Sequence, residues 1–202
     1  DAIPIKQFFK NKNNWFEKFV HLSSNKNAKF VNKRVNIKEI EKKINFKISD
    51  KQNFMEYSPL GLKYLKDILS FIKRNNGGLL IIDYGYFNEK MQDTLQAIYN
   101  QKYSKVLENI GNSDITYNIN FYLIEKIAKN LKELHIDFTS QKKFLTNLGI
   151  NQRAEIISKN KTFSQKSDIF YRLKRLIDKK QMGDLFKVML IKKANNNFKI
   201  GF

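Results

Sequence analysis

Residues 77–86, GGLLIIDYGY, constrain the fold more than any other part of the sequence. Four consecutive apolar residues, 79–82, lie between a glycine pair and Asp83. A short apolar run bounded by turn residues predicts a strand buried on both faces, as in a parallel sheet covered by helices. In open α/β sheets, ligands bind beyond the carboxyl ends of the strands, so a site is expected near Asp83. The alternative is that Asp83 ends the strand and accepts backbone hydrogen bonds in the next turn.

The clearest predicted helix comes directly before this strand. Ser58 suits the N-cap position and Pro59 the first helical turn, and apolar residues then recur at helical spacing as far as Ile72. Asn75, Asn76 and the glycine that follows tolerate a left-handed cap, so the helix should end there. Helix, short turn and buried strand form the repeating element of a doubly wound sheet. The residues therefore predict an α/β domain.

The segments before and after this element carry weaker signals. Residues 1–50 predict a loop and short antiparallel strands, including a half-exposed strand where apolar and polar residues alternate over 44–48. Residues 102–119 lack a clear period and predict a long loop, and loops of this length are often functional. Asp114 and Thr116 lie inside it, and the alternative to a catalytic role is a turn that begins at Asp114.

The last third of the sequence predicts helices followed by a final strand. Helices are expected over 121–131, from the cap at Ser140 to Gly149, over 152–159, and from Ser167 onward. A short strand is expected over 134–138, and residues 185–191 should form the last strand. Gly183 is expected to break the chain before that strand, and residues 195–202 should form a polar tail.

The charge of the chain is strongly basic, with 38 Lys and Arg against 19 Asp and Glu and a formal net charge of +19. Such an excess favours attraction to polyanions. The basic residues are mostly lysine, however, and are spread through a sequence rich in Asn and Ile, as an AT-biased coding sequence would produce. No Arg-rich run stands out, so a specific nucleic-acid partner is the less favoured interpretation.

Composition also limits the chemistry. The absence of cysteine excludes disulfides and thiolate metal sites, and the two histidines, His21 and His135, lie far apart in the sequence. No metal site is expected, and no apolar run is long enough to cross a membrane. The sequence begins with Asp1 rather than Met and lacks a signal-peptide pattern, so we expect it to be a piece of a longer chain.

An ordered set of short motifs carries a family resemblance over nearly the whole chain. In order they read DAIPIKQF (1–8), W-x-E-x-x-V (15–20), MEYSP (55–59), GGLLIIDYGY (77–86), DTLQA (93–97), GNSDIT (111–116), NINF (118–121), Q-x-x-FL-x-x-LGI-x-x-RA (141–154) and MGDLFKVML (182–190). In this order the motifs resemble the MidA-type family of class I S-adenosylmethionine-dependent methyltransferases, whose mitochondrial member is an arginine methyltransferase that assists respiratory complex I assembly.

The resemblance implies the C-terminal part of a Rossmann-like class I methyltransferase sheet with added helices and short antiparallel strands. It also implies that the last strand is antiparallel to its neighbours, and that residues 1–202 are a single partial domain. The family's cofactor is S-adenosylmethionine, and its glycine-rich E-x-G-x-G-x-G segment lies upstream of everything present here. Because the cofactor-binding residues belong to that absent half, none can be assigned in this chain, which should be inactive alone.

Site residues carry over only where the motifs match. The resemblance implies catalytic roles for Asp1, Asp83 and Asp114, and substrate-binding roles for Glu56, Tyr84 and Thr116. Arginine methylation needs carboxylate or carbonyl acceptors that hold the guanidinium and leave a nitrogen lone pair facing the methyl group. The implied partners are a protein substrate, such as a complex I subunit, and a separate N-terminal half. The implied location is the bacterial cytoplasm or, alternatively, the mitochondrial matrix.

Departures from the family pattern favour a second hypothesis, a non-catalytic remnant or protein-interaction module. Asn118 and Asn120 stand where the family commonly has His and Asp, and two amides cannot act as a general base. Gln101 replaces a usual His, and Ile110 a usual Pro. A basic nucleic-acid-binding domain is the third and least favoured alternative.

Overall fold

The computed structural model describes residues 1–24 and 27–202. The chain forms two compact units, each described here by itself: unit 1 is Asp1–Lys66 with Asn88–Asn120, and unit 2 is Asp67–Phe87 with Phe121–Phe202. The expectation of a single partial domain stays a prediction.

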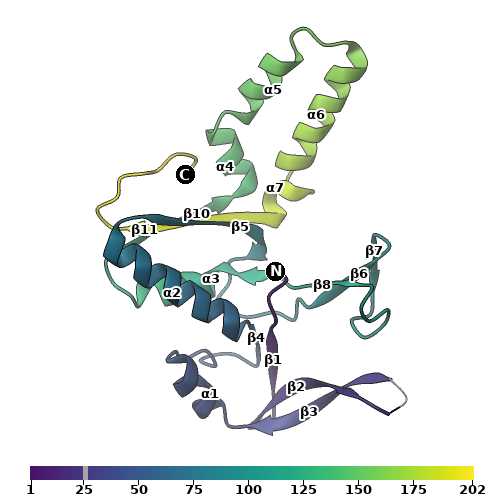
Figure 1. The fold of residues 1–202 in the computed structure, drawn as a ribbon, viewed down its shortest axis with the longest axis vertical. Helices are drawn as coiled ribbons and strands as arrows, with labels where there is room; N and C mark the ends of the chain where they lie inside the picture. Colours follow the sequence, from purple (N-terminus) through teal and green to yellow (C-terminus); the bar gives the residue numbers. More distant parts are fainter. Residues whose placement is uncertain (25–26) are drawn as a thin grey trace. The chain divides into compact units, whose positions relative to one another are not determined.

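Unit 1 contains an antiparallel sheet with the strand order β3-β2-β1-β4 (Figure 1). The prediction of short antiparallel strands in the first part of the chain is confirmed. Phe8 is fully buried, and its ring stacks on Tyr57 across the β1–β4 pair at 5.9 Å. The strands are β1 (Lys6–Asn11), β2 (Asn14–Leu22), β3 (Ala28–Val35) and β4 (Phe54–Tyr57).

The half-exposed strand expected over 44–48 is wrong, because a helix, α1 (Ile37–Ile44), ends at its first residue. The Asn36 side chain caps this helix by accepting a hydrogen bond from the Lys38 N–H at 3.2 Å. Asn45, at φ 50°, ends it in the left-handed conformation. The alternation of apolar residues after Ile44 comes from this cap and the turn beyond it.

Residues 102–119 are only in part the loop that their irregular pattern predicts: 105–113 contain no strand or helix, but short strands lie on either side. With β6 these two strands form a small antiparallel sheet of order β7-β6-β8, and Asp114 begins a strand rather than a turn. Asn100 and Gln101 both have left-handed φ values, 48° and 62°, as the tight turn between β6 and β7 requires. The strands of this sheet are β6 (Gln96–Tyr99), β7 (Lys102–Ser104) and β8 (Asp114–Thr116), and the two-residue strand β9 (Ile119–Asn120) follows them in the chain without joining this sheet.

Unit 2 is built on strands in the order β10-β11-β5, in which β11 pairs antiparallel with both neighbours. The last strand and its antiparallel setting are therefore confirmed. Burial of β5 on both faces is wrong, since Leu80 and Ile82 are 47% and 49% exposed. The doubly buried strand is β11, in which residues 188–192 are all buried. The strands are β5 (Gly78–Tyr86), β10 (Leu134–Ser140) and β11 (Phe186–Lys193).

The predicted helix before β5 is confirmed as α2 (Pro59–Asn75). The Ser58 hydroxyl accepts a hydrogen bond from the Gly61 N–H at 2.9 Å, as an N-cap should. Leu69 and Ile72 are buried on its apolar face. Asn76 follows at φ 54°, the left-handed conformation that the sequence predicts.

The remaining helices belong to unit 2, and two expectations about them are corrected. The helix expected from Ser167 begins earlier, at Phe163, because Thr162 and Gln165 form a reciprocal capping box. Gly183 does not break the chain but lies buried inside the short helix α7. The helices are α3 (Phe121–Lys129), α4 (Gln141–Asn147), α5 (Ile150–Ser158), α6 (Phe163–Ile177) and α7 (Met182–Leu185).

The C-terminal segment, residues 195–202, was expected to be a polar tail but packs against the rest of unit 2. The Phe202 ring packs on Phe144 with centroids 5.2 Å apart. Lys192, only 2% exposed, donates a hydrogen bond to the Phe198 carbonyl. Its Nζ also lies 3.2 Å from Asp137 Oδ2, and the other oxygen of Asp137 lies 3.1 Å from His135 Nε2. An ion pair between a buried lysine and a partly exposed aspartate thus lies beside the point where the C-terminal segment attaches.

This ion pair predicts a loss of stability in acid. Burial raises the pKa of Asp137, but the Lys192 and His135 side chains outweigh burial and hold that pKa below the usual 3.8. Because the pKa of Asp137 is lower in the folded chain than in the unfolded chain, the ionised carboxylate stabilises the fold at pH values above 3.8, the pKa in the unfolded chain. This stabilisation is lost as the pH falls through the lower pKa of the folded chain. We expect Asp137→Asn to reduce the acid dependence of urea unfolding, and Asp67→Asn, an exposed control on α2, to leave it unchanged. Equal acid dependence in wild type and Asp137→Asn would contradict this assignment.

Candidate functional site

A buried carboxylate, Glu56, forms the centre of a polar cluster in unit 1. Glu56 and Gln7 lie opposite each other in the antiparallel β1–β4 pair, so their side chains share one face of the sheet. Glu56 is 4% exposed; its Oε2 accepts from Gln7 Nε2 at 2.6 Å and its Oε1 from Thr94 Oγ1 at 2.5 Å. The strand pairing therefore fixes the position of this acid.

Gln7 joins Glu56 to a second carboxylate. Its Nε2 also donates to Asp93 Oδ1 at 2.7 Å, and Asp93 Oδ2 lies 3.4 Å from Lys18 Nζ. Two carboxylate acceptors determine which end of the amide carries the nitrogen. Gln7 is 4% exposed, and among the described residues no donor pairs with its Oε1. A buried acceptor without a partner costs free energy, so a ligand that donates a hydrogen bond to Gln7 Oε1 would be stabilised.

The surroundings of Glu56 disfavour its ionised form. Burial raises the pKa of Glu56 above its usual 4.5, and the charge of Asp93 adds to this effect. Hydrogen bonds from Thr94 and Gln7 act in the opposite direction, but burial prevails. A cation placed beside Glu56 would favour its ionised form.

Hydrogen bonds attach the chain around residue 94 firmly to the sheet. The Asn118 N–H donates to Thr94 Oγ1 at 2.9 Å, so this hydroxyl both donates and accepts. Gln52 Nε2 donates to the Glu89 carbonyl at 2.7 Å, and Gln52 Oε1 accepts from the Met91 N–H at 3.0 Å. The cluster is therefore preorganised by contacts from separate segments of unit 1.

The other predicted site residues of unit 1 have different surroundings. Thr116 is buried at the end of β8, and its Oγ1 accepts from Gln96 Nε2 at 3.2 Å. Asp114 is exposed at the beginning of the same strand. The backbone carbonyl of Asp1 accepts from the Tyr117 N–H at 3.3 Å. Of the predicted residues in unit 1, only Glu56 belongs to the cluster by the bonds described above.

Asp83 and Tyr84 belong to unit 2. Asp83 Oδ1 accepts a hydrogen bond from the Tyr84 N–H at 2.8 Å, but Asp83 does not end the strand, because β5 continues to Tyr86. The Tyr84 ring meets Phe186 edge to face at 5.6 Å. Their catalytic and substrate-binding roles stay predictions.

Sequence reasoning missed three members of the cluster, Gln7, Asp93 and Thr94. All three lie in motif segments that carry the family resemblance, 1–8 and 93–97, but no role was assigned to them. The available signal was Gln7 itself, a polar residue directly before two phenylalanines in a strand. Its partners could not be predicted, because the contact with Asp93 joins residues that are distant in the sequence.

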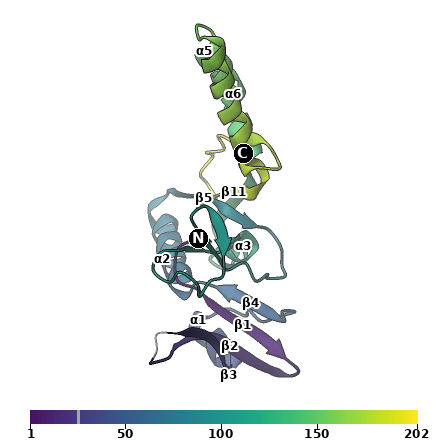
Figure 2. The ribbon, with the colours of Figure 1, turned by 90° about the vertical axis from the view of Figure 1, so that its right-hand side faces the viewer.

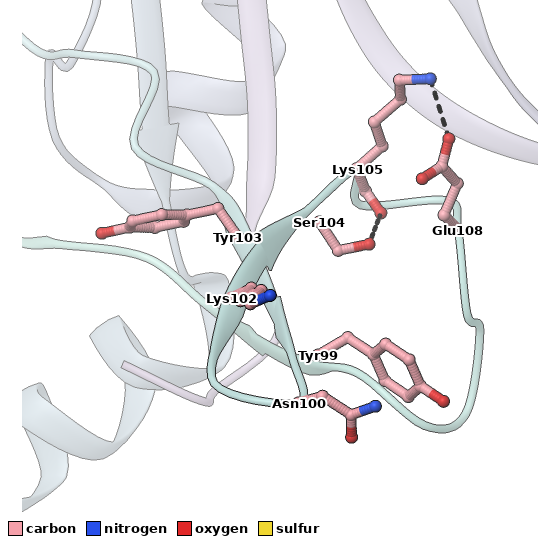
Figure 3. A pocket seen from close by; sticks show the side chains of 7 residues that line it. All are labelled: Tyr99, Asn100, Lys102, Tyr103, Ser104, Lys105 and Glu108. Atoms are coloured by element: carbon pink, nitrogen blue, oxygen red, sulfur yellow. Dashed lines mark hydrogen bonds and ion pairs between the residues drawn. The ribbon is translucent and has the colours of Figure 1, made fainter.

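Unit 1 also contains two surface hollows. The first, of about 590 Å³, lies at the β6–β7 hairpin. Tyr99 and Asn100 face the loop after β7, and Tyr103 points away from it (Figure 3). In this loop Lys105 Nζ lies 2.8 Å from Glu108 Oε1. The Glu56 cluster lines neither hollow. The second hollow, of about 420 Å³, is lined by α1, the four strands β1 to β4, and the adjoining residues Asn36 and Pro59.

The second hollow has a buried phenol beside a carboxylate. Glu17 is 7% exposed, and its Oε1 accepts from Lys6 Nζ at 2.7 Å. Burial and the Glu17 charge raise the pKa of Tyr57 to about 12, so this phenol stays protonated at neutral pH. The hollow is therefore able to donate and accept hydrogen bonds, but its lining alone does not define a ligand.

Two absences hold for the part of the chain that the structure describes. No three His, Cys, Asp or Glu residues there gather closely enough to hold a metal ion. Within the same residues, no helix has the length and apolar character needed to cross a membrane.

Comparison with known proteins identifies the family. Residues 1–139 match the sequence profile of a family described as "Putative S-adenosyl-L-methionine-dependent methyltransferase". The chain belongs to this methyltransferase family. The match confirms the MidA-type resemblance of the motifs, and the cofactor of the family is S-adenosylmethionine.

Curated relatives are similar over most of this chain but extend well beyond it. The zebrafish (Danio rerio) mitochondrial protein arginine methyltransferase NDUFAF7 is 24% identical over 187 residues, which are 93% of this chain and 44% of the relative. The Caenorhabditis elegans homolog is 28% identical over 155 residues, 76% of this chain and 36% of its own length. The chain thus spans less than half the length of these relatives.

A solved structure shows that the fold is shared. A protein from Burkholderia thailandensis, crystallised with S-adenosyl-homocysteine, matches 100% of this chain with 53% of its own, at a TM-score of 0.80 and 20% identity. A native crystal structure of a protein of the same superfamily, also from Burkholderia thailandensis, matches equally well at a TM-score of 0.80. At this identity the likeness shows the fold alone.

The described residues do not by themselves fit S-adenosylmethionine. A class I cofactor cradle needs glycines in a turn after a strand, where backbone N–H groups approach the ligand, and a carboxylate for the ribose hydroxyls. The left-handed glycines of this chain lie elsewhere: Gly111 in the loop before β8, Gly149 between two helices, and Gly201 in the tail. No reaction step through the cofactor can therefore be assigned to these residues.

Proposed function

We propose that this chain is the C-terminal portion of an S-adenosylmethionine-dependent protein arginine methyltransferase, in which the Glu56 cluster binds the guanidinium of the substrate. The family match over residues 1–139 carries the methyltransferase part of the proposal. The arginine substrate is supported by relatives that are named protein arginine methyltransferases.

The chemistry of the cluster fits a guanidinium. This group is planar, carries five N–H donors and has no acceptor. The carboxylates of Glu56 and Asp93 and the unpaired Oε1 of Gln7 are all acceptors. Oε1 of Glu56 accepts only from Thr94 Oγ1 and retains a lone pair for a donor-rich cation, whereas Oε2 already accepts from Gln7 Nε2 and from the Thr94 N–H. Burial would strengthen each of these bonds.

Hydrogen bonds to one edge of the guanidinium would support methyl transfer. Hydrogen bonds to fixed acceptors orient the group, so that one nitrogen can face an incoming methyl group. Glu56 is fixed by Gln7 and Thr94, and needs little rearrangement on binding. On this proposal Glu56 touches the substrate, while Gln7 and Thr94 position it.

The proposal includes a partner for this portion. A longer chain or a separate N-terminal half would supply the glycine-rich segment, and this portion alone would be inactive. The substrate is a protein, such as a subunit of respiratory complex I, in the bacterial cytoplasm or the mitochondrial matrix. Relatives that are mitochondrial proteins support the second location.

Reconstitution tests this function. The chain is mixed with the separately produced N-terminal half of a family member, and transfer of labelled methyl from S-adenosylmethionine to an arginine-containing protein is measured. We expect transfer only in the mixture, and none to a substrate in which lysine replaces the arginine. No cofactor binding and no transfer in any mixture would overturn the active form of the proposal.

One observation favours the alternative, a non-catalytic interaction module. Asn120 is buried, and its Nδ2 donates to the Asn88 carbonyl at 3.2 Å. A carboxylate at this position, as the family commonly has, could not donate this bond. Residue 120 therefore has a structural role here, and a mixture that assembles but transfers no methyl would support this alternative.

A further inference from the structure

Helices α5 and α6 form an antiparallel arm that leaves the strands of unit 2 (Figures 1 and 2). In α5, Ala154 and Ser158 are buried, one turn apart, whereas none of the residues of α6 is buried. The tip of the arm, where residues 159–162 join the two helices, therefore has little covering from the rest of unit 2.

Apolar side chains gather at this tip. Phe163, the first residue of α6, is 87% exposed. Ile156 and Ile157, in the last turn of α5, are 59% and 40% exposed. The three residues lie within eight positions of the sequence, on either side of the connection between the two helices. An exposed apolar surface formed by neighbouring side chains marks a contact with another molecule or a membrane.

The charge around these side chains has one sign. Lys159, Lys161 and Lys166 lie between Ile156 and residue 167, and no acidic residue occurs in this stretch. Over the whole arm, residues 150–177, seven Lys and Arg outnumber two Asp and Glu, a net +5 of the chain's +19. We call Ile156, Ile157, Phe163 and these three lysines the tip patch.

The size and charge of the tip patch decide what it can bind. A stable protein partner buries on the order of 800 Å² of each surface, and the end of a two-helix arm offers much less. A second copy of this chain would bring like charges together. An anionic membrane surface needs no matching pocket, attracts lysines and accepts exposed aromatic and aliphatic side chains at its interface.

We propose that the tip patch binds the surface of anionic lipid membranes without crossing the bilayer. Phe163 and the two isoleucines enter the boundary between headgroups and acyl chains. The lysine stems lie along the apolar surface while their ammonium groups meet lipid phosphates. The arm is a peripheral anchor, and no helix needs to span the membrane.

Vesicle sedimentation tests the proposal. The 202-residue chain is mixed with phosphatidylcholine vesicles, and with vesicles containing about 30% phosphatidylglycerol, and we expect strong binding only to the second. The double variant Lys159→Gln/Lys161→Gln should bind roughly 25-fold more weakly, since each lysine near the surface contributes about 1 kcal/mol. The matched pair Lys38→Gln/Lys42→Gln, exposed in unit 1, should bind like wild type. Equal weakening by both pairs would show attraction by net charge alone and overturn the proposal.

Insertion has its own measurement. Phe163→Trp should show a blue-shifted fluorescence on anionic vesicles, while Tyr171→Trp, at a position 69% exposed in the middle of α6, should not. Phe163→Ala should weaken binding about fivefold with unchanged far-UV circular dichroism. Unshifted fluorescence of Phe163→Trp, or undiminished binding of Phe163→Ala, would overturn insertion and favour a protein partner for the tip patch.

Discussion

Replacing Gly183 by alanine should destabilise the chain by about 3 kcal/mol, although alanine is the better helix former. A Cβ at this position would lie 2.5 Å from the Ile177 carbonyl oxygen, 2.6 Å from its carbon and 2.7 Å from the Asp178 carbonyl oxygen. These are backbone atoms at the end of α6, so no side-chain rotation can relieve the overlap. The helix α7 would have to move away from α6.

Gly77→Ala is the matched control. Gly77 lies just before β5, and an added Cβ there would meet no atom within 4 Å. Its free energy of unfolding, measured by urea denaturation, should stay within about 0.5 kcal/mol of wild type. If Gly183→Ala proved as stable as Gly77→Ala, the close approach of α6 and α7 would be contradicted.

Gly183 also shows where sequence reasoning reaches its limit. Glycine was interpreted from its local tendency to break a helix, but here it is needed for a close contact between two backbones. The ends of α2 depend on local interactions, and both were predicted correctly: Ser58 caps the start of the helix, and Asn76 follows its end in the left-handed conformation. Helix α1 has an equally local cap at Asn36, and was missed because the apolar alternation after it was given more weight.

The strands show the same distinction between local and distant causes. An apolar run indicates that 79–82 is a strand, but not whether both of its faces will be buried. Burial on both faces belongs to β11, where Val188, Met189 and Ile191 are fully buried. β11 pairs with β5 through residues more than 100 positions apart, and periodicity contains no information on that pairing.

The candidate site was only partly predictable for a related reason. Glu56 could be named because its motif matches the family, yet nothing in the sequence connects it with Gln7 or Asp93. Their contact depends on the β1–β4 register and on the path of the chain before β6. The orphaned Gln7 oxygen, which most directly indicates a donor ligand, becomes visible only when both carboxylates are in place.

Glu56→Gln should reduce methyl transfer by the reconstituted protein about 100-fold, the scale on which one oriented electrostatic contact acts in a catalytic site. This prediction depends on the proposed function. Glutamine keeps the shape of the side chain and removes the charge that would hold the guanidinium. Its Oε1 can still accept from Gln7, and its Nε2 can donate to Thr94 Oγ1, so only the proton of the Thr94 hydroxyl loses its acceptor. Stability should therefore change by no more than about 1 kcal/mol.

The separation of activity from stability makes the role of Glu56 testable. Glu17→Gln is the matched control: Glu17 is equally buried on the same sheet but pairs with Lys6 outside the cluster. It should lose some stability and keep methyl transfer once folded. A substrate contact predicts that Glu56→Gln raises KM for the protein substrate and lowers kcat, with cofactor binding unchanged. If Glu56→Gln transferred methyl like wild type while Glu17→Gln behaved as expected, the guanidinium would be bound elsewhere, and the cluster would serve only to hold the chain around Thr94 on the sheet.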